Sequence, residues 1–309
     1  MTLANESLII FDGACGTTLQ TMNIPLHIWE GKQGCNEQLN LSGPEFIINL
    51  HQQFLEAGAM AIETNTFGAS SIVLAEYGLE DKVREINFAA VNNARKAISN
   101  LKDNDRPRYV IGSVGPTTKL PTLGHITPEQ LKISLKEQIS ALLEAGVDAL
   151  IIETCQDMLQ LKTALICTFE LVEAIDLNIP IFCSATFEKQ GTMLLGTDIG
   201  AVCATIAPFP VFSLGLNCAT GPDDMVSHIQ YLAKHWQGRI SCIPNQGMPQ
   251  VKEGQTFYPM GPEEYSEHML KFVTEYGVSI VGGCCGTSPA HIAQVAKTLK
   301  NVKPDRIAA

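Results

Sequence analysis

The sequence predicts a single-domain α/β protein with a TIM-type (β/α)8 barrel, and three observations support this fold class. Short apolar runs alternate with segments of helical periodicity along nearly the whole chain. The runs are apolar throughout, as expected of parallel strands that are buried on both faces. Eight such strand and helix pairs in 309 residues fit a barrel, whose usual length is about 250 residues. We expect one domain over 1–309, with short flexible ends at 1–7 and 301–309.

Eight apolar runs, each ending in small or polar residues, are the predicted strands. In chain order they occupy 8–11, 59–63, 109–114, 148–153, 180–185, 211–217, 240–244 and 279–283. The predicted helices occupy 44–57, 82–101, 128–145, 158–175, 199–206, 222–235, 262–276 and 289–299. Several helices begin with proline, as at Pro44 and Pro128, and several are followed by glycine, as at Gly58 and Gly146. An open doubly wound sheet is the alternative, but its glycine-rich phosphate turn is not evident.

The composition limits the partners and the compartment. A net charge of −11 argues against binding to a nucleic-acid backbone, and 45% hydrophobic residues predict a large core. The sequence has no basic region followed by a long apolar run, and no apolar stretch long enough to span a bilayer. We therefore expect a cytoplasmic protein without membrane partners, whose thiols stay reduced.

The ten cysteines divide by their surroundings. Four lie in apolar segments and are predicted to be small core residues, namely Cys167, Cys183, Cys203 and Cys242. The others are candidates for metal binding or catalysis.

Polar residues gather where the predicted strands end. In a barrel all of these ends lie on one face, which is the face that carries active sites. The residues that follow or end seven of the eight strands are Asp12, Glu63, Gly115, Glu153, Asn217, Cys218, Asn245, Cys284 and Cys285.

Three of these residues have the chemistry of a zinc site. The neighbours Cys284 and Cys285 rarely form a disulfide with each other, because the ring would be strained. Cys218 ends the sixth strand, which lies near the eighth strand in a barrel. Three thiolates leave one zinc position open, as in a catalytic site. Such a negative centre is suited to binding another thiol as a thiolate.

Other interpretations of these cysteines remain open. Cys218 alone is also consistent with a buried core thiol. The pair Cys284 and Cys285 is also consistent with a vicinal redox pair, although no Cys-x-x-Cys motif accompanies it. A closed structural site would need a fourth protein ligand, for which Cys15 and His125 are candidates.

Four motifs together carry a family resemblance. They are GGCCGT at 282–287, GLNC at 215–218, DGACGT at 12–17 and ETNTFGA at 63–69. In this order and spacing they resemble the homocysteine S-methyltransferase family. Within it they are most similar to the N-terminal homocysteine-binding module of cobalamin-dependent methionine synthase. The resemblance covers roughly 8–299 and is specific because it combines four motifs.

The resemblance implies a zinc ion held by Cys218, Cys284 and Cys285 in a (β/α)8 barrel. It also implies that the side-chain oxygen of Asn245, in PNQG at 244–247, is an exchangeable fourth ligand. The sulfur of L-homocysteine would replace this oxygen. The alternative for Asn245 is a turn residue that hydrogen-bonds to nearby backbone groups.

The turn after the first strand resembles the family's site for the amino-acid part of homocysteine. Small residues, including Gly13, Gly16 and Thr17, can offer successive backbone N–H groups to a carboxylate. Asp12 matches the aspartate of the same motif.

Two glutamates at strand ends complete this set of expectations. Glu153 matches the family's substrate-binding glutamate and would receive the ammonium group. Glu63 is a candidate for orienting loops or ligand cysteines. Helix capping or a loop-orienting hydrogen bond is the alternative role for Asp12 and Glu153.

The resemblance implies methyl transfer to homocysteine, which gives L-methionine, and CNEQLN at 35–40 favours methylcobalamin as the donor. The chain contains neither a second, methyltetrahydrofolate-binding barrel nor the histidine motif of a corrinoid module, so we expect these modules on another domain or protein. The alternatives are betaine or S-methylmethionine as donor, which would need an aromatic cage. Trp29 is a candidate for that cage, whereas Trp236 suits packing. A zinc-thiolate scaffold without homocysteine activity is the second alternative.

Overall fold

Eight parallel strands form a closed barrel in the structure, a computed structural model that describes residues 2–102, 106–248, 250–252 and 255–305. The strand order is β1-β10-β7-β6-β5-β4-β3-β2, and every neighbouring pair is parallel. A bridge between Phe11 and Ala61 joins the two outer strands and closes the ring. The predicted single-domain (β/α)8 barrel is confirmed, and the doubly wound alternative is wrong.

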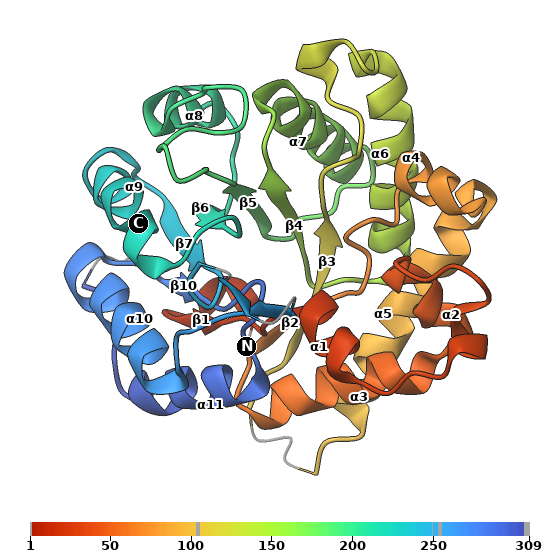
Figure 1. Cartoon of the computed structure of the whole chain (residues 1–309). Helices are drawn as coiled ribbons and strands as arrows, with labels where there is room; N and C mark the ends of the chain where they lie inside the picture. Colours follow the sequence, from red (N-terminus) through yellow and green to blue (C-terminus); the bar gives the residue numbers. More distant parts are fainter. Residues whose placement is uncertain (1, 103–105, 249, 253–254, 306–309) are drawn as a thin grey trace.

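Each barrel strand overlaps one predicted run. The strands are β1 (Ile9–Ile10), β2 (Ala61–Glu63), β3 (Tyr109–Val114), β4 (Ala149–Cys155), β5 (Ile181–Ala185), β6 (Ser213–Asn217), β7 (Arg239–Ile243) and β10 (Ile280–Val281). Eight helices surround them (Figure 1), namely α3 (Pro44–Glu56), α5 (Val83–Ser99), α6 (Pro128–Ala145), α7 (Met158–Ala174), α8 (Ile199–Ile206), α9 (Pro222–His235), α10 (Pro262–Tyr276) and α11 (Pro289–Thr298).

The connections that follow the strands contain short elements that the sequence pattern did not predict. They include the helices α1 (Cys15–Thr21), α2 (Leu39–Ser42) and α4 (Ser71–Leu74), and the antiparallel hairpin of β8 (Gln250–Lys252) and β9 (Gln255–Phe257). Each is too short to display a hydrophobic period. They all lie at the face where the carboxyl ends of the strands meet.

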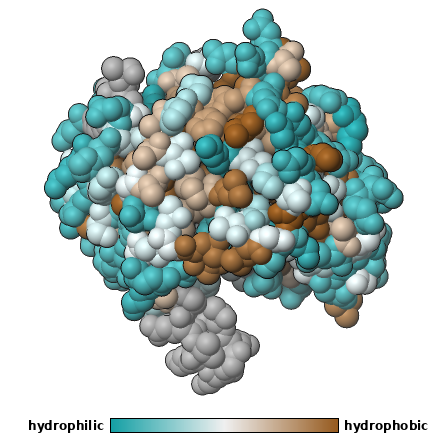
Figure 2. Space-filling view, turned by 90° about the horizontal axis from the view of Figure 1, so that it is seen from above, coloured by the Kyte–Doolittle hydropathy of each residue, from teal (hydrophilic) through white to brown (hydrophobic). Residues whose placement is uncertain are grey.

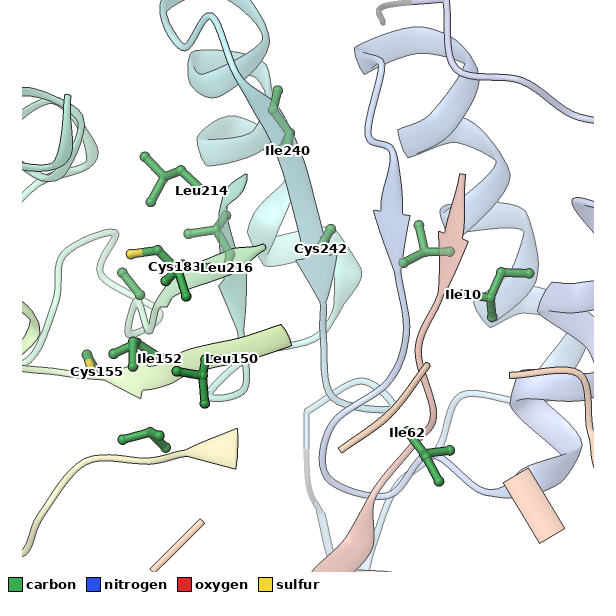
Figure 3. Packing of buried hydrophobic residues seen from close by; sticks show 14 of the residues in the cluster. Ile10, Ile62, Leu150, Ile152, Cys155, Cys183, Leu214, Leu216, Ile240 and Cys242 are labelled. Atoms are coloured by element: carbon green, nitrogen blue, oxygen red, sulfur yellow. The ribbon is translucent and has the colours of Figure 1, made fainter. Parts of the chain in front are cut away.

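The core has two layers because successive residues on a strand point to opposite faces. Ile9, Phe11 and Phe182 belong to the cluster inside the barrel, where the two phenylalanine rings meet edge to face with centroids 5.3 Å apart. Ile10 and Ile152 belong to the cluster between strands and helices, part of which Figure 3 shows. Both faces of each strand are therefore apolar, which explains the uninterrupted apolar runs.

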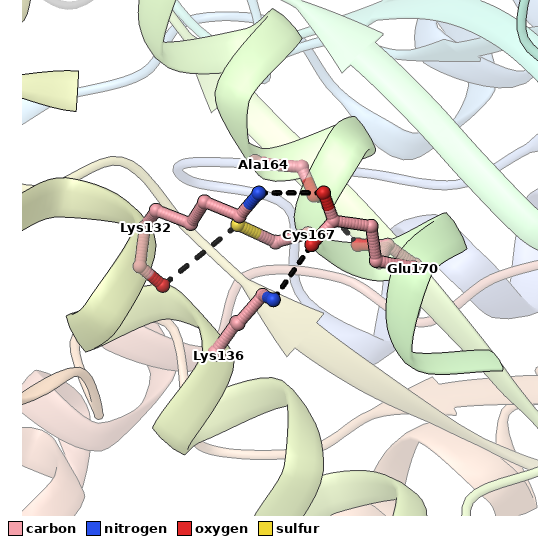
Figure 4. Close-up of polar contacts among 6 residues, drawn as sticks. Lys132, Lys136, Ala164, Cys167 and Glu170 are labelled. Atoms are coloured by element: carbon pink, nitrogen blue, oxygen red, sulfur yellow. Dashed lines mark hydrogen bonds and ion pairs between the residues drawn. The ribbon is translucent and has the colours of Figure 1, made fainter. Parts of the chain in front are cut away.

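The cysteines predicted to be core residues pack into the outer layer. Cys167, Cys183 and Cys242 are buried, and the partly buried Cys203 packs against the same cluster. Cys167 lies between α6 and α7, where its thiol donates a hydrogen bond to the carbonyl of Lys132 at 3.8 Å (Figure 4). Lys132 and Lys136 both pair with Glu170 there, at 2.5 and 2.6 Å. These contacts indicate a structural role in packing the two helices together.

The N-terminal end of the barrel is covered by the start of the chain. Leu3 is buried inside the barrel cluster, and the guanidinium of Arg239 donates to the carbonyls of Glu6 and Ala4 at 2.6 and 3.1 Å. Residues 1 and 306–309 of the predicted flexible ends lie outside the described residues. The predicted domain bounds, with flexible ends at 1–7 and 301–309, therefore stay a prediction.

The face seen in Figure 2 carries polar side chains with apolar ones in patches between them. Within the described residues, every helix is too short or too polar to cross a membrane.

Candidate metal and substrate site

Three thiols converge at the carboxyl ends of β6 and β10. Cys218 directly follows β6, and Cys284 and Cys285 follow β10. Their sulfur atoms all lie within 4.8 Å of one another, and those of Cys218 and Cys285 are 3.9 Å apart. The two strands flank β7 in the sheet, as the barrel prediction requires. The distances are those of a group that can share one metal ion.

Backbone contacts fix these thiols in place. The N–H groups of Cys218 and Cys284 donate to the carbonyls of Ile243 and Pro244, at 3.2 and 2.8 Å, so β7 anchors both sides. Cys218 and the next residue, Ala219, have φ values of 62° and 55°. A residue other than glycine in this left-handed region costs about 1–3 kcal/mol and persists where the surrounding structure holds it. The turn after β6 is therefore strained where it presents its sulfur.

Asn245 lies on a backbone segment that is hydrogen-bonded to the cysteine turns. It follows β7, is 4% exposed, and its N–H donates to the carbonyl of Thr220 at 3.1 Å. The next N–H, that of Gln246, donates to the carbonyl of Cys285 at 2.9 Å. Among the described residues, the side-chain oxygen of Asn245 has no hydrogen-bond partner. A buried oxygen left unpaired costs about 1–3 kcal/mol, and a metal ion would satisfy it.

The candidates for a closed structural site lie elsewhere. The thiol of Cys15 donates to the side-chain oxygen of Asn65 at 3.5 Å, and Nδ1 of His125 accepts from the N–H of Leu120 at 3.4 Å. Neither belongs to the three-thiol cluster. The three sulfurs, together with the unpaired amide oxygen of Asn245, could therefore form a donor set, and such a set would fit zinc with an exchangeable position.

The thiols influence one another's protonation. Hydrogen bonds from Cys218 and Cys284 lower the pKa of Cys285 to about 3. The hydrogen bond between Cys284 and Cys218 raises the pKa of the Cys284 thiol well above its usual value. One of the three thiols therefore loses its proton readily, whereas the other two would have to lose theirs for a divalent metal to bind.

Tyr258 lies against the turn that carries Cys285, and this contact was not predicted from the sequence. Its ring lies so close to Gly286 that a Cβ added there would be 2.6 Å from the nearest ring carbon. Burial, followed by the negative charge of the Cys285 thiolate, raises the pKa of Tyr258 to about 12. The side-chain amide of Gln246 donates to the carbonyl of Met260, at 2.5 Å, and fastens this segment beside the thiols.

Three carboxyl groups form the opposite half of the site. Asp12 follows β1, Glu63 ends β2 and Glu153 lies in β4. Burial raises the pKa of all three, and the other carboxyls raise those of Asp12 and Glu63 further. No ion pair between described residues involves any of them. The cluster therefore suits a cationic ligand, which would compensate these buried charges.

The side chain of Asn217 holds Glu153 in place. The strand register of β4 shifts between Ile152 and Cys155, and Thr154 has a φ of 55°. Asn217 donates to the Glu153 carboxylate and to the Thr154 hydroxyl, at 3.1 and 2.7 Å, and accepts from the Thr154 N–H at 2.9 Å. Bulges of this kind redirect side chains beside active sites.

The Glu153 carboxylate has a further donor in Ser113, whose hydroxyl lies 2.6 Å away. No role was predicted for Ser113 or for Asn217 from the sequence. The position of Asn217 directly before Cys218 is the one signal that pointed to it. Two successive residues therefore serve both clusters. Cys218 supplies a sulfur to the thiol cluster, and Asn217 supplies the side chain that holds Glu153 in the carboxyl cluster.

The turn after β1 lies beside the thiols. A Cβ on Gly13 would be 2.7 Å from the ring of Phe54, so this position admits only glycine without rearrangement. The N–H of Ala14 donates to Thr287 and is not available to a ligand. Gly16 and Thr17 lie in the first turn of α1, where N–H groups lack helical partners. The hydroxyl of Thr17 accepts from the N–H of Gly286 at 3.2 Å, which joins this turn to the cysteine turn.

Comparison with known proteins agrees with the motifs. The model of the homocysteine S-methyltransferase family matches residues 9–299. The chain belongs to this family. The predicted family and the predicted enzyme class are therefore confirmed, whereas the roles of individual site residues stay predictions.

Two curated relatives are methionine synthases of mycobacteria. That of Mycobacterium tuberculosis is 42% identical over 98% of the chain, and that of Mycobacterium leprae is 42% identical over 94%. The chain spans about a quarter of their lengths, 25% and 24%. The metallated form of the homocysteine methyltransferase MmuM from Escherichia coli is a similar solved structure. It has a TM-score of 0.76 and 25% identity, with 96% of this chain and 97% of that chain covered.

Proposed function

We propose that the chain holds Zn²⁺ through Cys218, Cys284 and Cys285, with Asn245 as the exchangeable fourth ligand, and methylates L-homocysteine to L-methionine. The observation that carries the proposal is the convergence of three thiols next to the segment of Asn245, whose side-chain oxygen is buried and unpaired among the described residues. A metal ion accounts for both features, since it would take the sulfurs as thiolates and satisfy the oxygen. Bound zinc would lower the pKa of the homocysteine thiol and keep the sulfur nucleophilic.

The carboxyl cluster is proposed to receive the other end of homocysteine. The ammonium group would lie against Glu153, with Asp12 and Glu63 adding negative charge. The N–H groups in the first turn of α1, around Gly16 and Thr17, would receive the carboxylate. The substrate would thus bridge the two halves of the site, with its sulfur directed to the thiols.

We propose methylcobalamin, carried by another domain or protein, as the methyl donor. In the transfer the sulfur forms a bond to the methyl carbon, the carbon–cobalt bond breaks, and its electron pair stays on cobalt. The proton of the homocysteine thiol leaves to solvent. The proposal is supported by the methionine synthase relatives, which are about four times as long as this chain. The remaining length would include corrinoid-binding and methyltetrahydrofolate-binding modules.

The barrel mouth offers a surface for a large donor. Among the described residues, nine large apolar side chains are exposed. Six of them lie on connections that follow strands or in the next helical turn: Leu26, Phe67, Leu123, Leu159, Leu194 and Met248. These side chains share the barrel face of the proposed site, and apolar groups on that face would suit contact with another domain or protein.

A small methylated cation such as betaine or S-methylmethionine is the second candidate donor. The likeness to the E. coli homocysteine methyltransferase, of which 97% is covered, supports this second candidate. Trp29 is partly buried at the end of a 3₁₀ helix (Leu26–Trp29) on the connection after β1, and would be the aromatic contact.

Turnover tests distinguish these donors. Methionine formation is measured with zinc-loaded protein, homocysteine and either methylcobalamin, betaine or S-methylmethionine, with Cys285→Ser as the inactive control. We expect turnover with methylcobalamin. Turnover with betaine or S-methylmethionine alone would overturn the donor assignment. Zinc content without any turnover would favour the scaffold alternative, and protein that cannot retain zinc would remove both proposals.

A further inference from the structure

The hydroxyl of Tyr265 lies between the ends of two strands that deliver metal ligands. Tyr265 belongs to α10 and is 0% exposed. Its hydroxyl contacts two backbone carbonyls, that of Gly282 at 2.7 Å and that of Pro244 at 3.1 Å. A hydroxyl has one proton to donate, so the shorter contact is the main hydrogen bond and the longer one shares it.

Both carbonyls belong to the segments that carry the donor atoms. Pro244 directly precedes Asn245 after β7, and Gly282 precedes Cys284 by two residues after β10. The strands themselves pair only at Ile280 and Val281. Beyond that point the contacts between the two segments include the hydrogen bond from the N–H of Cys284 to Pro244 and the hydroxyl of Tyr265.

The ring of Tyr265 is itself held in place. Its edge meets the ring of His291, with centroids 5.6 Å apart and planes at 90°. Nε2 of His291 donates to the carbonyl of Met260 at 3.1 Å, and its Nδ1 is hydrogen-bonded to the hydroxyl of Ser288 at 2.9 Å. The hydroxyl therefore has little freedom to follow the carbonyls if they move apart.

We propose that Tyr265 is a positioning residue of the metal centre. Its hydroxyl sets the spacing between the β7 and β10 ends, and with it the distance from the Asn245 oxygen to the sulfurs of Cys284 and Cys285. The proposal rests on the proposed zinc function of these residues. A clamp at this point matters because metal ligands bind tightly only when their surroundings hold them in the right geometry.

Tyr265→Phe tests the positioning role of the hydroxyl, because it removes one oxygen and keeps the ring that fills the core. Tyr276→Phe is the matched control at the end of the same helix, where the hydroxyl accepts from the side chain of Gln230 at 3.1 Å. Zinc release from the purified chain to a chromogenic chelator is timed for both variants. We expect release about tenfold faster in Tyr265→Phe and unchanged in Tyr276→Phe.

Cobalt(II) substitution gives the second measurement. The visible absorption of the cobalt form reports the ligand geometry, so Tyr265→Phe should shift the spectrum recorded without homocysteine. Wild-type release rates and spectra in Tyr265→Phe would overturn the proposal, as would a lower melting temperature with no change in either. If the wild-type chain itself binds neither zinc nor cobalt, the proposed zinc function fails instead, so the two failures are distinguishable.

Discussion

The two halves of the barrel mouth are held together by different means. Around β6, β7 and β10, backbone hydrogen bonds and the strained turn after β6 fix the three thiols and the backbone of Asn245. Around β1, β2 and β4, side-chain hydrogen bonds fix the carboxyls, as those of Asn217 and Ser113 do for Glu153. The first half has a geometry that allows little adjustment, whereas the second can adjust its charge by binding protons. This difference matches a metal on one side and a charged substrate on the other.

The largest effect is expected when one of the three thiols is removed. Cys285→Ser should remove zinc retention and methyl transfer together, because two sulfurs and an amide oxygen bind zinc weakly. Loss of several kcal/mol of metal-dependent stabilisation corresponds to a rate decrease of about 1,000-fold or more. Elemental analysis and turnover provide the measurement, with Cys203→Ser as the control that keeps both. A zinc-free Cys285→Ser protein with normal turnover would contradict the role of the cluster.

Removing the charge of one carboxyl group should leave zinc binding unchanged. Glu153→Gln keeps the shape of the side chain but removes the charge proposed to meet the ammonium group. A hydrogen bond to a charged group contributes about 1.5–3 kcal/mol, so kcat/KM for homocysteine should fall about 10- to 150-fold. Zinc content should stay at the wild-type value. Loss of zinc in Glu153→Gln would show that the halves are not independent.

The protonation of the carboxyl half can be measured through stability. Burial raises the folded-state pKa of Glu63 above its value in the unfolded chain, which is about 4. Between these two values the folded chain binds more protons, so this contribution to stability is lost as the pH rises. Glu63→Gln should therefore gain stability over the wild type in urea unfolding, and more at pH 8 than at pH 5. A gain that is equal at both pH values would contradict the raised pKa.

The smallest effect is expected outside both halves, at His51 on α3. Its ring is completely buried, and neither nitrogen has a hydrogen-bond partner among the described residues. Burial lowers the pKa of His51 to about 4, below the unfolded value of about 6.5. Stability is therefore lost as the pH falls from about 6.5 towards 4, the opposite slope to that of Glu63.

His51→Leu should raise the free energy of unfolding by about 1–3 kcal/mol, with the larger gain at pH 5. Zinc content and turnover should not change. Unfolding curves at pH 5 and pH 8 provide the measurement, and a destabilised variant at both pH values would show that the ring is satisfied.

Much of the fold was predictable because a barrel strand is apolar on both faces, as Ile9 and Ile10 show. The three cysteines were predictable because strand order brings β6 and β10 together. The positive φ of Thr154 and the clamp of Asn217 were not predictable, since they depend on the register between β4 and its neighbours. The contacts of Tyr258 and Tyr265 depend on where a loop and a helix pack, which no local pattern encodes.

We propose that, on zinc held by three cysteines, the sulfur of homocysteine replaces the oxygen of Asn245. Zinc-edge X-ray absorption of the purified chain, with and without L-homocysteine, tests it most directly. We expect three sulfur and one oxygen neighbours in the free protein, and four sulfurs with homocysteine. Asn245→Ala should change only the first spectrum. Three sulfurs and one oxygen in both states of the wild type would contradict the account.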